Sequence, residues 1–223
     1  MTYVLSDLHG NYKKFKALLE EISFRDEDVM YILGDLVDYG DEGMELIADL
    51  SLRLNVYGVA GEHDYLAARM LSGFDRMLKS GATPDPAYIA EMTAWVSDGG
   101  RTTLEGFRAL TEEQREGVLE YLEELSLFEE IEIKGKRYVL LHAGVADYAE
   151  GDDLEDFLPE DFFSAPLDAE VALMEDSTVI VGHVPTADGR ICYGEGSIFL
   201  DCGLAEGGRL GCLCIENGRE YYV

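Results

Sequence analysis

The chain has 223 residues, of which 47% are hydrophobic, and its formal net charge at pH 7 is −29. This length provides one domain with a complete hydrophobic core, or at most a domain with a small insert. The negative charge disfavours binding to duplex nucleic acid and repels anionic substrates at long range, so any phosphate chemistry would require local cations.

The N-terminal part of the chain alternates between strand and helix patterns. Buried strands are predicted at 2–6, 29–33 and 55–60, with one helix after Asn11 and another over 43–52. This β-α-β-α-β order predicts a sheet with parallel strands and right-handed crossovers.

The rest of the chain changes from helical to strand-like patterns. Residues 64–125 are predicted to form a helical insert, interrupted by a turn at 81–86. A hairpin is expected to turn at Gly135, and residues 147–170 have the composition of an acidic surface segment. Further strands are predicted within 177–183, 191–201 and 209–223. These patterns predict one domain over 1–223, a sandwich of two β-sheets with helices outside.

The lack of a targeting pattern and the spacing of the cysteines are the sequence features that bear on the cellular compartment. The N-terminal residues lack the basic and apolar regions of a signal peptide, and no stretch approaches the ~20 apolar residues of a membrane span. The four cysteines form no C-x-x-C pair, which argues against a structural zinc site. We therefore expect a cytoplasmic protein with reduced thiols and no membrane contact.

Five short polar segments each follow a predicted strand. They are SDLHG (6–10), GDLVDYG (34–40), GEHD (61–64), HAG (142–144) and GHVP (182–185). Strand ends at one edge of a sheet gather ligand-binding groups in α/β folds. Aspartate, histidine and glutamate with few thiols suit divalent metals such as manganese, iron or zinc.

The spacing of these side chains is compatible with metal ligation. Asp7 and His9 are two residues apart, so on an extended chain both would point to one side and bind one ion. The two oxygens of Asp35 could bridge two ions, and His142 and His183 would complete the second site. A single histidine is more often structural than a ligand, but all four histidines of the chain lie within these segments.

In order and spacing, the five segments resemble those of the calcineurin-like metallophosphoesterases. The resemblance is to the serine/threonine phosphoprotein phosphatase branch, including its bacterial members and the symmetric diadenosine tetraphosphatases. Residues 95–104 (WVSDGGRTTL) and 200–203 (LDCG) are similar to the bacterial members, so the resemblance extends from residue 5 to about 215. It implies an α/β fold, a four-layer αββα sandwich of two mixed sheets with flanking helices and a helical insert at about 64–125.

The resemblance also implies the roles of the polar residues. Two divalent ions (manganese, iron or zinc) would hold a bridging hydroxide that attacks phosphorus directly. His63, oriented by Asp38, would protonate the leaving oxygen. The implied metal ligands are Asp7, His9 and Asp35 for the first ion, and Asp35, Glu62, His142 and His183 for the second.

Two residues depart from the family pattern. Glu62 stands where the family has asparagine, so the site gains a negative charge and loses a hydrogen-bond donor. Tyr39 stands where an arginine would clamp phosphate oxygens, and it offers one weaker donor. Arg101 is a candidate for a substitute clamp. Weaker binding of doubly charged phosphomonoesters, or a preference for a singly charged diester, is therefore expected.

Two functional hypotheses follow. The first is a dinuclear metal-dependent phosphoesterase that hydrolyses a phosphomonoester, such as a phosphorylated small molecule or phosphoprotein, or a nucleotide anhydride. The second is a metal-binding but catalytically weakened relative that binds a phosphorylated ligand or partner, as the residues at 39 and 62 suggest.

Overall fold

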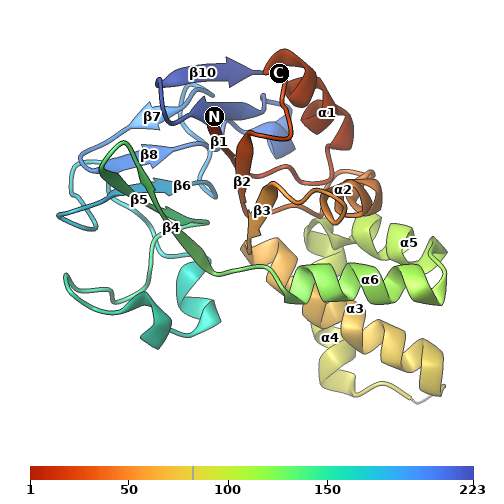
Figure 1. Cartoon of the computed structure of the whole chain (residues 1–223). Helices are drawn as coiled ribbons and strands as arrows, with labels where there is room; N and C mark the ends of the chain where they lie inside the picture. Colours follow the sequence, from red (N-terminus) through yellow and green to blue (C-terminus); the bar gives the residue numbers. More distant parts are fainter. Residues whose placement is uncertain (82) are drawn as a thin grey trace.

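The computed structural model describes residues 1–81 and 83–223, in which two five-stranded β-sheets pack together (Figure 1). The first sheet has the strand order β10-β9-β1-β2-β3. Its strands are β1 (Thr2–Leu5), β2 (Val29–Leu33), β3 (Val56–Val59), β9 (Gly211–Cys214) and β10 (Arg219–Tyr222). β1, β2 and β3 are parallel, which confirms the order predicted for the N-terminal part.

The second sheet has the order β4-β5-β6-β8-β7 and is also mixed. Its strands are β4 (Phe128–Ile133), β5 (Lys136–Leu141), β6 (Thr178–Val181), β7 (Cys192–Tyr193) and β8 (Ser197–Phe199). The predicted hairpin joins β4 to β5, where Gly135 has a φ of 75° that favours glycine. The strand pattern predicted within 191–201 corresponds to β7 and β8, which pair as a second hairpin.

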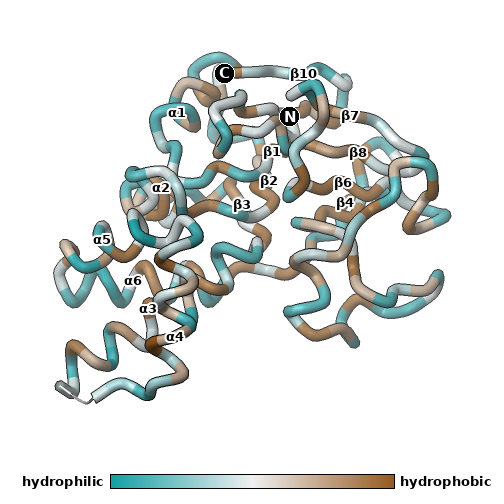
Figure 2. The backbone as a smooth tube through the Cα atoms, turned by 180° about the vertical axis from the view of Figure 1, so that it is seen from behind, coloured by the Kyte–Doolittle hydropathy of each residue, from teal (hydrophilic) through white to brown (hydrophobic). Residues whose placement is uncertain are grey.

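A layer of aliphatic side chains fills the space between the two sheets. Val4, Leu33 and Leu213 of the first sheet form one buried cluster with Leu140 and Ile180 of the second. Each such buried side chain contributes roughly 1.5–3 kcal/mol to folding. Figure 2 shows hydrophobic residues along the central strands and hydrophilic residues over much of the outer helices and loops. The sheets are therefore held face to face, as in the predicted sandwich.

Helices cover the other face of the first sheet. α1 (Tyr12–Glu21) and α2 (Gly43–Leu50) pack on strand residues such as Leu5 and Ile32. The neighbours of these residues along each strand point to the opposite face, between the two sheets. α3 (Glu62–Ser80), α4 (Pro86–Trp95), α5 (Arg101–Ala109) and α6 (Glu112–Glu123) follow along the chain. These four helices gather beyond α2 and β3 (Figure 1), and they correspond to the helical pattern predicted at 64–125. The turn predicted at 81–86 includes Ala82, which lies outside the described residues.

The four helices share a core with the first sheet. Met70, Trp95, Phe107 and Leu122 belong to the same buried cluster as the residues under α1 and α2. Trp95 and Phe107 are at most 1% exposed. The helices are therefore packed on the sheet layers and can contribute side chains to a site there.

The segment predicted as acidic surface also has a buried side. Leu154, Phe162 and Phe163 are buried against Val139 and Val179, on the outer face of the second sheet. Their backbone forms 3-10 turns at Leu154–Asp156 and Pro159–Phe162, so this outer layer is mostly irregular. In the described part of the chain, no helix has both the length and the apolar character that a membrane crossing requires.

Candidate metal site

The five polar segments meet where the carboxyl ends of parallel strands from both sheets come together. Asp7 follows β1, Asp35 follows β2, and His142 and His183 follow β5 and β6. Backbone hydrogen bonds join the loops, from the Asp7 amide to Gly34 (3.1 Å) and from the Gly182 amide to His142 (2.9 Å). The topology therefore brings together residues that lie up to 176 positions apart in the chain.

Several site residues have left-handed backbone conformations. Positive φ angles occur at Asp7 (54°), His9 (41°), Asp35 (53°), Asp38 (71°), Tyr39 (62°) and His183 (69°). Such angles are uncommon for residues other than glycine and persist where the surrounding structure enforces them. The expectation that Asp7 and His9 share a side of an extended chain is therefore wrong, because β1 ends at Leu5 and tight turns direct these side chains.

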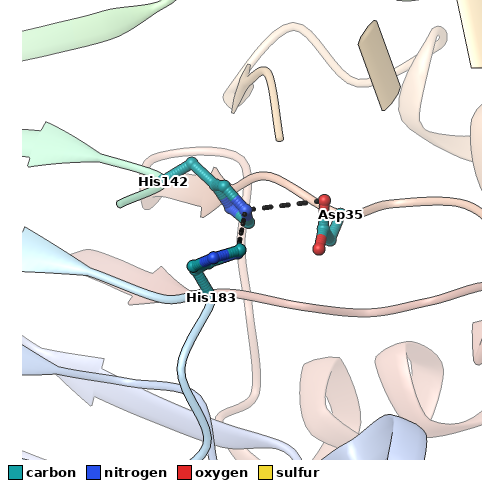
Figure 3. A group of neighbouring side chains, drawn as sticks. All are labelled: Asp35, His142 and His183. Atoms are coloured by element: carbon teal, nitrogen blue, oxygen red, sulfur yellow. Dashed lines mark hydrogen bonds and ion pairs between the residues drawn. The ribbon is translucent and has the colours of Figure 1, made fainter. Parts of the chain in front are cut away.

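Asp35 lies between two groups of metal-ligating side chains. Within each group, Asp7–His9–Asp35 and Asp35–His142–His183, the ligand atoms are within 4.8 Å of one another. Oδ2 of Asp35 is 3.5 Å from Nε2 of His9, and Oδ1 is 3.6 Å from Nε2 of His142. Figure 3 shows His142 and His183 beside this carboxylate, with Nε2 of His142 3.1 Å from Nδ1 of His183. One carboxylate thus faces both groups through different oxygens.

The histidine tautomers fit a bound cation. Nδ1 of His9 is 3.1 Å from the Val37 carbonyl oxygen, and Nδ1 of His142 is 2.9 Å from the Leu33 carbonyl oxygen. Because a carbonyl oxygen only accepts, each neutral ring carries its proton on Nδ1, and Nε2 presents a lone pair towards Asp35. With their protons on Nδ1, Nε2 of His9 and Nε2 of His142 cannot donate to the Asp35 oxygens that they face, and a metal ion could be bound by these nitrogens and oxygens together.

The charges of the site also fit a cation. Burial raises the pKa of Asp7 well above its usual value, and the charges of Asp201 and Asp35 raise it further. Across residues 1–81 and 83–223, neither lysine nor arginine forms an ion pair with these three carboxylates. Burial and His142 lower the pKa of His183, which keeps this ring neutral and able to ligate. A divalent ion would supply the positive charge that no described lysine or arginine supplies to these carboxylates.

Close backbone approach leaves no room beside the carboxylates. A Cβ atom at Gly61 would overlap with Oδ1 of Asp35, and one at Gly182 would overlap with Oδ2 of Asp7. Glycine is therefore required sterically at both positions.

The residues at the start of α3 have different positions. Glu62 is exposed and belongs to neither ligand group among the described residues, so its ligation stays a prediction. The next residue, His63, is partly buried, and its backbone amide donates to Oδ1 of Asp35 (3.1 Å).

His63 is linked to a buried network centred on Asp38. Oδ2 of Asp38 accepts hydrogen bonds from Nδ1 of His63 and Nε1 of Trp95, both at 2.8 Å. Oδ1 accepts from the Thr103 hydroxyl at 2.6 Å, and that hydroxyl accepts from the Asp38 amide at 2.9 Å. Asp38 is fully buried and Thr103 is 2% exposed. Residues from α4 and α5 thus orient the carboxylate that holds His63.

The environment of His63 favours its protonated form. Burial lowers the pKa of the ring, but the hydrogen bond to Asp38 and the charges of Asp35 and Asp38 outweigh this effect. Together they raise the pKa of His63 to about 9. In the metal-free protein the ring is therefore a cation at neutral pH.

Asp64 is a site residue that the sequence did not single out. Its Oδ1 accepts from the amides of Leu36 (2.8 Å) and Val37 (3.3 Å), and its Oδ2 accepts from the Gly61 amide (3.0 Å). Burial and the charge of Asp35 raise the pKa of Asp64 to about 7. Its position three residues after the N-cap of α3, where acidic residues cap helices, is the signal that identifies it.

Tyr39 lies beside His9 and His63, and Arg101 is the first residue of α5. The Tyr39 hydroxyl donates to Oδ1 of Asp98 (3.4 Å), so the donor considered for phosphate is already engaged. Arg101 is exposed at the start of α5 and forms no ion pair with the described residues. The structure therefore places neither side chain as a ready phosphate clamp.

Comparisons with known proteins agree with this geometry. The family model for calcineurin-like phosphoesterases matches residues 2–208. An uncharacterized protein of Methanocaldococcus jannaschii is 28% identical over 211 residues, covering 90% of this chain and 71% of that protein. A symmetrical bis(5'-nucleosyl)-tetraphosphatase of Buchnera aphidicola is 46% identical over 65 residues, which are 28% of this chain and 24% of that protein.

A solved structure supports the same assignment at the level of the fold. The metallophosphoesterase from Sphaerobacter thermophilus has a TM-score of 0.58 and 19% identity, covering 100% of this chain and 87% of that chain. Because the family model matches nearly the whole sequence, the chain belongs to the calcineurin-like phosphoesterases, as the sequence predicted.

Proposed function

We propose that this protein is a dinuclear metal-dependent hydrolase of phosphate esters or nucleotide anhydrides. The observation that carries the proposal is Asp35, whose two oxygens face His9 and His142 separately. Residues 1–223 would act as one domain, with α3–α6 as an insert that supplies the support for Asp38.

The ligand groups define which residues would hold the ions. Asp7, His9 and Asp35 would bind one ion, and Asp35, His142 and His183 would bind the other, with Glu62 as a further ligand after a change of rotamer. When bound, two divalent ions activate water and neutralise charge on phosphate oxygens. Oxygen and imidazole donors of this kind suit manganese, iron or zinc.

His63 would deliver a proton to the leaving oxygen. Since Asp38 accepts from Nδ1, the proton available to a substrate is on Nε2. A pKa raised to about 9 keeps that proton on the ring at neutral pH. A protonated group held next to the ligand cluster is what expulsion of an alkoxide or phosphate requires.

A nucleotide is the substrate class that we favour. The Buchnera relative is named for hydrolysis of bis(5'-nucleosyl) tetraphosphates, and its match includes 28% of this chain. Arg101, which forms no ion pair with residues 1–81 or 83–223, would approach the phosphate chain in place of the arginine that Tyr39 replaces. Phosphomonoesters, including phosphoproteins, are the competing substrates.

The test combines metal analysis with hydrolysis. Purified protein should bind two divalent ions per chain, and with added manganese it should hydrolyse 4-nitrophenyl phosphate or diadenosine tetraphosphate. Asp35→Asn and His142→Ala should each abolish both properties, whereas Asp26→Asn, the same chemical change at an exposed position, should alter neither. Full activity in both site variants would refute the proposal.

The second candidate is a catalytically weakened protein that binds a phosphorylated ligand. The engaged Tyr39 hydroxyl and the exposed Glu62 favour it, because both remove interactions with phosphate. Under this hypothesis the double variant Glu62→Asn, Tyr39→Arg should gain turnover sharply. Robust hydrolysis by the unmodified protein, with no gain in the double variant, would eliminate this candidate.

A further inference from the structure

Tyr39 presents an aromatic surface at the mouth of the site. Its side chain is 45% exposed, although the two rings that it contacts are buried or partly buried. The ring centroid lies 5.1 Å from that of His9 and 5.2 Å from that of His63, with interplanar angles of 80° and 62°. Tyr39 therefore stands edge-to-face against one proposed metal ligand and the proposed proton donor, with part of its surface open to solvent.

The position of this ring is fixed from two sides. The Tyr39 amide donates to the Gly99 carbonyl (3.0 Å), and the hydroxyl donates to Asp98 (3.4 Å). Gly99 lies so close that an added Cβ atom would come within 3.0 Å of the ring. Asp98 and Gly99 have non-helical backbone angles at the break between α4 and α5. The break thus brings backbone and a carboxylate against Tyr39 and holds the ring in place.

The chemistry of this surface differs from that of a phosphate clamp. The hydroxyl is engaged by Asp98, and the neutral ring carries no charge to attract phosphate. What it offers is an ordered aromatic surface next to the group that would protonate the leaving oxygen. Planar aromatic groups stack on such surfaces, and nucleobases do so regardless of their hydrogen-bonding pattern.

We propose that Tyr39, held by Asp98 and Gly99, is a stacking platform that selects substrates carrying a planar aromatic group on the leaving-group side. The inference rests on the proposed hydrolase function and specifies its substrate class. The aromatic group would be a nucleobase or an aryl ester, which share this chemistry. Tyr39 would determine specificity, while the ligand groups and His63 perform the reaction.

Two substrate pairs test the platform and distinguish the two sources. Adenosine 5'-monophosphate and ribose 5-phosphate differ in the nucleobase, and phosphotyrosine and phosphoserine differ in the aryl ring. Tyr39→Leu should lower the ratio of kcat/KM values within one pair about tenfold, while Tyr39→Phe should retain the ratio. Tyr57→Leu is the matched control, because Tyr57 is 46% exposed and lies on β3. Loss within the first pair identifies a nucleobase, and loss within the second identifies an aryl ester.

Other outcomes overturn the proposal. If Tyr39→Leu reduces both members of each pair equally, the residue acts on the phosphate or the fold and the platform is refuted. Unchanged ratios in both pairs refute it as well. Refutation of the platform must be distinguished from a lack of hydrolytic activity. Calorimetric titration of the metal-loaded protein with adenosine 5'-monophosphate and ribose 5-phosphate does so, because it measures binding without requiring hydrolysis. Tighter nucleotide binding that Tyr39→Leu removes supports the platform even without turnover, and equal binding of the two ligands together with an unchanged ratio in the aryl pair contradicts it.

Discussion

Replacement of Thr103 by valine removes one hydroxyl from the network around Asp38 at nearly constant volume. That hydroxyl donates to the Asp38 carboxylate at 2.6 Å and accepts from the Asp38 amide at 2.9 Å. Both residues are buried, so water cannot replace either hydrogen bond. A hydrogen bond to a charged group is worth roughly 1.5–3 kcal/mol, and an unpaired buried amide adds about 1–3 kcal/mol. We expect the free energy of unfolding, measured by urea denaturation, to fall by about 3 kcal/mol.

The same change should weaken proton donation by His63. With Oδ1 of Asp38 unsatisfied, the carboxylate can rotate and no longer fixes the imidazole, although Trp95 still donates to Oδ2. Loss of such a supporting contact costs roughly 10–100-fold in activity. A donor matters most when the leaving oxygen is basic, so the loss should be larger for phenyl phosphate than for 4-nitrophenyl phosphate.

A neighbouring threonine provides the matched control. Thr102 is partly buried, and its hydroxyl donates to the Gly99 carbonyl (3.4 Å), outside the network around Asp38. Thr102→Val should leave both stability and leaving-group dependence nearly unchanged. If Thr103→Val behaves like Thr102→Val, or lowers activity equally for every leaving group, the role assigned to the Asp38 network is wrong.

Three further predictions concern pH, loop anchoring and close packing. The pKa of His63 is raised from 6.5 to about 9 in the metal-free protein. The protonated ring should therefore add about 3 kcal/mol to the free energy of unfolding, and this contribution should be complete below pH 6.5. Urea denaturation should therefore show that the free energy of unfolding is larger for the wild type than for His63→Gln, and that this difference disappears as the pH rises through 9. Asp64→Asn replaces one acceptor oxygen with a donor facing the Gly61 amide, so metal content, measured by atomic emission, and stability should both fall, the latter by about 2 kcal/mol. Gly61→Ala should displace Asp35 and abolish metal binding in calorimetric titrations, whereas Gly117→Ala, with open space around it, should not.

The sequence was sufficient to predict the order of elements and the approximate position of the site. Short-range hydrophobic patterns indicated β1 to β3 and the helices between them, because each buried strand or helix face is encoded locally. Once parallel strands are established, their carboxyl ends must meet at one edge. For that reason Asp7 and Asp35, which follow adjacent strands of the first sheet, could be expected to lie close together. That His142 and His183 of the second sheet join them was implied by the resemblance to the calcineurin-like family.

The tertiary structure decided which atoms face one another. The left-handed backbone at Asp7 and His9 is enforced by contacts between loops, and local sequence predicted an extended chain instead. The hydrogen bond from Trp95 to Asp38 spans 57 positions in the sequence, a pairing that no local pattern encodes. The engaged hydroxyl of Tyr39 likewise depends on Asp98, 59 positions away. Sequence specified the chemical groups because composition and periodicity are local, whereas orientation depends on long-range packing that only the folded chain supplies.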